Sequence, residues 1–86
     1  MDFAKQLKQY QYEKHMTNDA FAKHIGKRRA WLQRIYSKNP DIPKSTLGEL
    51  TMYMLNEKLN IPYDVMEEYN TYVISTRGEN NTKWVD

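Results

Sequence analysis

Apolar side chains in the first third of the chain recur every three or four positions, with polar residues between them. This spacing predicts helices, because residues three or four apart lie on one helical face. We expect a first helix over residues 2–15, a second from Thr17 to Gly26, and a third over residues 28–36. Their inward-facing positions are Phe3, Leu7, Tyr10, Phe21, Ala22, Ile25, Leu32 and Ile35.

Local signals mark where the second and third helices begin and end. Thr17 offers a side-chain oxygen for N-capping, and Asp19 puts an acid beside the positive end of the second helix. Gly26 suits the left-handed conformation that ends many helices. Pro40 cannot continue the third helix, so a loop is expected over residues 37–41.

Two further helices are expected in the second half of the chain. The fourth covers residues 46–59, capped by Ser45 or Thr46, and Asn60 is its expected stop. The fifth covers residues 62–70 and starts with a proline, whose fixed φ suits a first helical turn. The inward-facing apolar side chains of these two helices are expected to be Leu47, Leu50, Met54, Leu55, Val65, Met66 and Tyr69.

The C-terminal tail has a different pattern. Residues 72–76 and 82–85 favour strands, and the turn-rich residues 77–81 lie between them, which predicts a β-hairpin. The alternative is a frayed, flexible tail. The sequence therefore predicts an all-α, five-helix domain over residues 1–70, followed by a hairpin or tail over residues 71–86. Apolar residues in excess of one small core suggest that Met52, Tyr53, Met54 and the Trp84 hairpin form a dimer surface.

Basic residues gather in one segment of this chain. Overall, 13 basic side chains stand against 11 acidic ones in 86 residues, but residues 23–44 contain a single acid, Asp41. Such a basic island indicates a polyanionic partner, and a merely solvated cationic surface is the alternative. The basic residues of this segment are Lys23, Lys27, Arg28, Arg29, Arg34, Lys38 and Lys44.

The chain lacks the sequence signals that are typical of several functional classes. The chain has no cysteine, so disulfides and thiolate metal sites are excluded, and a reducing cytoplasm is the expected location. No apolar stretch is long enough for a membrane span, and the first residues lack the layout of a signal peptide. We find no paired nucleophile and base, metal-ligand spacing or phosphate loop. We therefore expect no enzyme activity, cofactor, metal site, membrane or small-molecule substrate.

Residues 17–35 resemble the helix-turn-helix of the Cro/CI family, also called lambda-repressor-like or XRE-type. The family pattern has a Thr, then Leu or Phe followed by Ala, an aliphatic residue followed by Gly, and two later aliphatic residues. A weaker likeness at residues 42–50 and 59–62 extends the resemblance to roughly residues 3–70. The seven positions of the pattern are filled by Thr17, Phe21, Ala22, Ile25, Gly26, Leu32 and Ile35.

The resemblance implies a five-helix lambda-repressor-like fold whose third helix enters the major groove of double-stranded DNA. Residues at the start of that helix and one turn later would contact bases: Arg28, Arg29, Ala30, Gln33 and Arg34. Residues flanking the groove would bind backbone phosphates: Asn18, Lys27, Lys38, Asn39 and Lys44. For each lysine, a solvated surface charge is the alternative.

The sequence departs from the family at three places. The fourth helix, expected over residues 46–59, is longer than is typical by about one to two turns. Tyr36 replaces a usual acidic residue, and residues 37–40 replace a usual glycine turn. The expected function is a homodimeric, sequence-specific transcriptional regulator, a repressor of a phage, plasmid or other mobile element. The alternatives are a DNA-binding accessory factor, such as an excisionase-like, replication, partition or antitoxin protein, and a protein-interaction module on the same fold.

Overall fold

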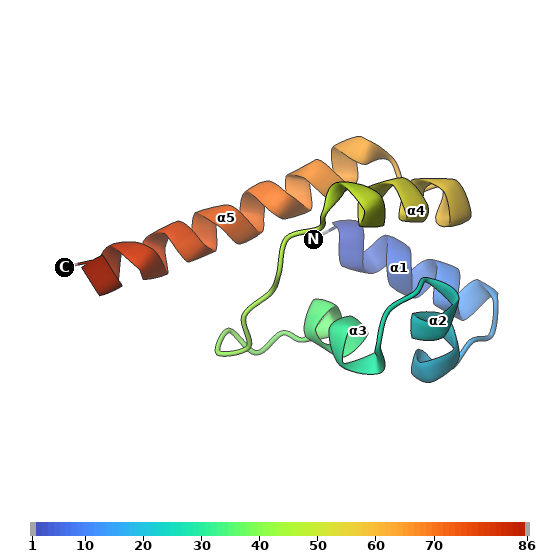
Figure 1. The fold of residues 1–86 in the computed structure, drawn as a ribbon. Helices are drawn as coiled ribbons and strands as arrows, with labels where there is room; N and C mark the ends of the chain where they lie inside the picture. The colour runs from blue at the N-terminus through green and yellow to red at the C-terminus, as the bar shows by residue number, and fades with distance from the viewer. Residues whose placement is uncertain (1, 86) are drawn as a thin grey trace.

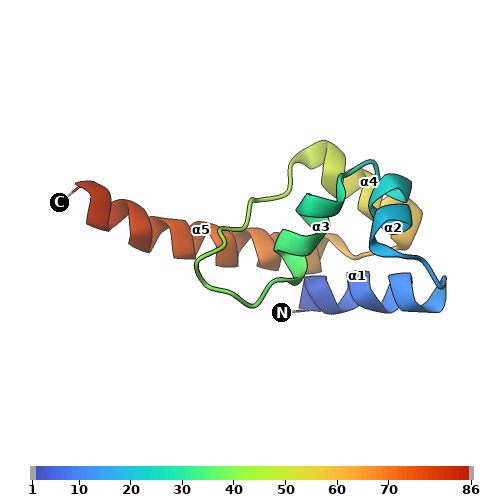
Figure 2. The ribbon, with the colours of Figure 1, turned by 90° about the horizontal axis from the view of Figure 1, so that it is seen from below.

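The computed structural model describes the backbone of residues 2–85 and the side chains of residues 2–76. Over this range the chain forms five helices, as expected, but no strand of the expected hairpin: α1 (Asp2–Glu13), α2 (Asn18–His24), α3 (Arg29–Tyr36), α4 (Glu49–Leu59) and α5 (Tyr63–Val85). In Figure 1, α2 and α3 lie on one side of the molecule and α4 and the first half of α5 on the other, and Figure 2 shows that α1 runs along one edge of the molecule. None of these helices has the length and apolar character that crossing a bilayer requires.

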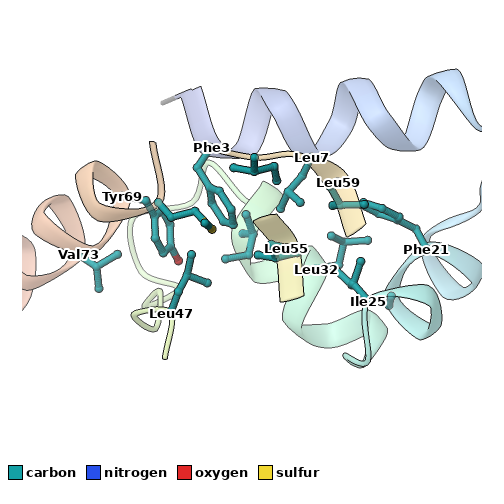
Figure 3. Close-up of a cluster of buried hydrophobic side chains, with 14 residues drawn as sticks. Phe3, Leu7, Phe21, Ile25, Leu32, Leu47, Leu55, Leu59, Tyr69 and Val73 are labelled. Carbon is teal, nitrogen blue, oxygen red and sulfur yellow. The ribbon is translucent and has the colours of Figure 1, made fainter. Parts of the chain in front are cut away.

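All five helices contribute side chains to one hydrophobic core, which Figure 3 shows in close-up. Most of the inward-facing residues that the helical spacing predicts are buried there, which confirms the predicted periodicity. Additional core residues are Leu59, Ile61 and Val73. The buried side chains predicted correctly are Phe3, Leu7, Phe21, Ala22, Ile25, Leu32, Ile35, Leu47, Leu55, Met66 and Tyr69.

The short α2 helix has the predicted signals at both ends. The Thr17 hydroxyl accepts a hydrogen bond from the backbone N–H of Ala20 at 3.1 Å. Gly26 has a φ of 69°, and the N–H groups of Gly26 and Lys27 donate to the carbonyls of Lys23 and Ala22. This is the paired hydrogen bonding of a Schellman ending, and it fixes the direction in which the chain leaves α2 toward α3.

The beginning of α4 differs from the expectation. The helix begins at Glu49 rather than Thr46, and its N-cap is Gly48, without a side-chain hydrogen bond. The side chain of Asn70 accepts from the N–H of Leu47 at 2.7 Å and donates to its carbonyl at 3.0 Å. Because these bonds occupy both backbone groups of Leu47, this residue stays outside the helix.

This later start also corrects the predicted inner face of α4. The pattern that began at Leu47 placed Leu50 in the core, but Leu50 is 86% exposed. Leu47 lies before the helix, so the helical spacing of three residues does not place Leu50 on the same face as Leu47. The buried face of α4 is formed instead by Leu55 and Leu59.

The predicted C-terminal β-hairpin is wrong, because α5 continues as a helix to Val85. Met66, Tyr69 and Val73 are all buried, which matches the period of a helix and not the alternation of a strand. Packing of this face therefore overrides the local strand preference of residues 72–76. In Figures 1 and 2 the second half of α5 projects beyond the other helices. The side chain of Trp84, a candidate for the dimer surface, lies outside the described residues.

Candidate nucleic-acid interface

The outward face of α3 brings the five predicted base-contacting residues together. Leu32 and Ile35 turn inward and anchor the helix in the core. The other positions of the helix face solvent, apart from the half-buried Trp31 and Tyr36, and the residue before the helix is exposed as its N-cap. Figure 2 views the molecule from this side, with α3 in front of α5. The exposed residues are Arg28, Arg29, Ala30, Gln33 and Arg34.

The charges of the molecule are separated between its two sides. The α3 surface and its flanking loops carry the basic segment, whereas residues 46–76 contain Lys58 as their only cation. Figure 1 shows that α4 and the first half of α5 lie on the side of the molecule opposite α3. A polyanion is therefore attracted to the α3 side and repelled from the other. The exposed acids of the opposite side are Glu49, Glu57, Asp64, Glu67 and Glu68.

One arginine of this surface lies near an acid. The Nε atom of Arg29 is 3.6 Å from Oδ1 of Asp19, and both side chains are largely exposed. A pair of this length in water is weak, so the guanidinium can exchange the carboxylate for another acceptor. Arg28 and Arg34 have no acidic partner within the described part of the chain.

Three of the predicted phosphate ligands flank α3 at its two ends. The Nζ atom of Lys27 lies 5.4 Å from the centroid of the half-buried Trp31 ring, an arrangement suited to a cation–π interaction. At the other end, Lys38 and Asn39 are exposed in the loop after the helix. The Asn39 side chain also accepts from the N–H of Asp41 at 2.9 Å, which shapes the turn.

Lys44 has a different role from the predicted phosphate contact. Its Nζ donates to the carbonyls of Arg34, Ile35 and Ser37 at 2.8, 2.8 and 3.0 Å. An ammonium group has three donors, so these contacts use all of them. Partial burial also lowers the pKa of Lys44, because desolvation disfavours the charged form. The residue thus caps the C-terminal end of α3, where a cation opposes the negative end of the helix dipole.

Substitution of Lys44 tests this assignment. We expect Lys44→Met to lower the free energy of unfolding in urea by about 1–3 kcal/mol, the cost of losing charged hydrogen bonds. If the chain binds DNA, the salt dependence of that binding should be the same in this variant. Lys38→Met is the matched control, since that exposed residue should contribute within about 0.5 kcal/mol to stability. A stable Lys44→Met protein with a reduced salt dependence would instead support the phosphate role.

A polar network that the sequence did not predict joins α1, α2 and α3. The Tyr36 hydroxyl donates to Oε1 of Gln11 at 2.9 Å. Nε2 of Gln11 donates to Oδ1 of Asn18 at 2.7 Å and to the carbonyl of Met16 at 3.1 Å. Burial raises the pKa of Tyr36, so its phenol remains a neutral donor at physiological pH. Asn18, a predicted phosphate ligand, is thereby held by α1 and indirectly by α3.

Taken together, the α3 face offers arginine forks, one amide and one methyl group, with further donors at its edges. Guanidinium and amide groups are suited to the acceptors of base edges and phosphates. The sequence patterns identified the exposed groups. Only the structure shows that Lys44 already donates three hydrogen bonds and that Asn18 accepts one from Gln11.

Comparisons of the chain with protein-family models, with curated proteins and with solved structures find no significant match.

Proposed function

We propose that the chain binds double-stranded DNA through the outward face of α3, as a sequence-specific transcriptional regulator of the Cro/CI helix-turn-helix type. The observation that carries this proposal is the exposure of Arg28, Arg29, Gln33 and Arg34 on one surface of one short helix. Leu32 and Ile35 anchor the opposite face of that helix, so the polar face stays fixed relative to the core.

The side chains on this face suit the edges of base pairs. An arginine fork matches the N7 and O6 acceptors of guanine, and the Gln33 amide matches N6 and N7 of adenine. Ala30 offers a small apolar surface for a thymine methyl group. Lys27, Lys38 and Asn39 lie at the edges of the helix, where backbone phosphates would pass on either side of the major groove.

We further propose that two copies act together on DNA. The eight residues of α3 extend for about 12 Å, which covers only a few base pairs of one groove. Two such helices separated by one turn of DNA would contact a near-palindromic site. Sedimentation at increasing protein concentration, with and without DNA, tests the pairing, and a monomer under both conditions would contradict it.

Fluorescence anisotropy with labelled duplexes of random sequence tests DNA binding itself. At low salt, even non-specific binding should be measurable, and it should weaken with salt by about 0.9 log units per decade for each phosphate contact. Selection of bound fragments from a random pool should then enrich one short symmetric motif. Absence of binding at low salt would reject the proposal, and binding without enrichment would reject its sequence specificity.

A further inference from the structure

A solvent-open hollow of about 490 Å³ lies where the network residues of α1, α2 and α3 meet. The residues that line it include Lys8, Asn18, Tyr12 and Met16. The Nζ atom of Lys8 is 4.9 Å from the centroid of the Tyr36 ring. A cation–π interaction at this distance holds the ammonium group beside the hollow.

The Met16 carbonyl sets the orientation of the whole network. This carbonyl only accepts hydrogen bonds, so the Gln11 side-chain atom facing it must be Nε2. The same Nε2 lies 2.7 Å from Asn18, which must therefore present Oδ1 to Gln11. The remaining Gln11 oxygen accepts from the Tyr36 hydroxyl, which burial keeps protonated. No other arrangement of the two amides satisfies all three contacts.

This order of donors and acceptors determines what Asn18 offers to a ligand. Since its oxygen is occupied by Gln11, its Nδ2 group is the part left for an external partner. This nitrogen has no hydrogen bond within the part of the chain that the structure describes. An amide donor and the Lys8 ammonium on one open surface suit an oxyanion, whereas an amide presenting its oxygen would repel one.

We propose that this hollow is a seat for a DNA backbone phosphate, in which Lys8 supplies the charge, Asn18 donates through Nδ2, and Gln11 is the positioning residue. The inference rests on the proposed DNA-binding function and adds a contact from α1 to it. Tyr36, the last residue of α3, lines the hollow, and Asp19, next to Asn18, pairs with Arg29 at the start of the same helix. A strand whose bases meet α3 would therefore pass the hollow.

A double-mutant cycle on DNA affinity tests the role of Gln11. Asn18→Ala and Gln11→Leu should each weaken binding by about 10-fold to 100-fold, the range for a charge-assisted hydrogen bond. If Gln11 acts through Asn18, Gln11→Leu should change affinity by less than about two-fold in the Asn18→Ala protein. A merely structural role for Gln11 would weaken binding equally in both backgrounds, and this result would overturn the proposal. Urea unfolding shows that each variant is folded under the assay conditions.

A second pair of variants keeps the test decisive if Gln11→Leu does not fold. Lys8→Gln should reduce the slope of log affinity against log salt by about 0.9 for each phosphate seat. Lys5→Gln is the matched control, because Lys5 is exposed on the same helix and lies outside the hollow. Equal salt slopes for Lys8→Gln and Lys5→Gln would overturn the proposed phosphate site without contradicting DNA binding by the chain. If the unmodified chain does not bind DNA, the proposed function fails, which is a different outcome.

Discussion

Replacement of Arg28, Arg29 and Arg34 together by glutamine is expected to weaken binding to the selected DNA motif by about 10²-fold to 10⁴-fold. Each arginine fork on a guanine contributes about 1–3 kcal/mol of discrimination, and neighbouring contacts are not fully additive. All three side chains are exposed, so their loss should leave the core intact. Anisotropy with the selected duplex and with random duplexes measures the change, which should be larger for the selected duplex.

The control for this variant has the same total charge. Lys5, Lys14 and Lys58 lie on α1 and α4, are exposed, and belong to neither the α3 face nor the α1–α2–α3 hollow. Their joint replacement by glutamine removes three positive charges without removing a proposed DNA contact, although it also removes the hydrogen bond from Lys58 Nζ to the carbonyl of His24 at 2.9 Å. We expect only a small, salt-sensitive loss of affinity from this control. Equal losses from both triple variants would mean that net charge, and not the α3 face, governs binding.

Phe21→Ala is expected to lower the free energy of unfolding by about 3–5 kcal/mol, the largest loss of stability predicted for this chain. Phe21 is fully buried, and its ring centroid is 5.8 Å from that of Tyr10, so the substitution leaves a cavity between α1 and α2. Such a cavity costs about 3–5 kcal/mol. A domain of this length has a total stability of about 4–13 kcal/mol, so the loss would take between about a quarter and the whole of the margin. Urea unfolding followed by circular dichroism measures the effect.

Leu50→Ala is the informative comparison for Phe21→Ala. The sequence pattern alone would put both residues in the core and predict a large loss of stability from each substitution. Because Leu50 is 86% exposed, we expect its truncation to change the free energy of unfolding by less than about 0.5 kcal/mol. A loss of several kcal/mol from Leu50→Ala would mean that α4 packs as the pattern predicted.

Short-range features of this fold were predictable from the sequence. Thr17, Gly26 and Asn60 act within a few residues of themselves, as a cap and as two positions of positive φ. Helical spacing likewise identified most of the core, because burial follows the helical period wherever a helix is correctly bounded. The exposed face of α3 followed from the same reasoning.

Features that depend on distant residues were not predictable in this way. The start of α4 is set by Asn70, 23 positions after Leu47, and the helical tail is set by packing around Val73. Lys44 looked like any other lysine of the basic segment until its distance to the end of α3 was known. Gln11 and Tyr36 are 25 positions apart, so no local pattern connects them.

Amide chemical shifts during titration with a DNA duplex would show which surface of the chain contacts DNA. A duplex of about 20 base pairs, roughly two helical turns, is added at low salt to the isotopically labelled chain. We predict that the shifted amides belong to α2, α3 and the loops at residues 25–28 and 37–39, while those of α4 and α5 opposite stay unchanged. Shifts concentrated on α4 and α5, or no shifts at all, would rule out DNA binding through the outward face of α3.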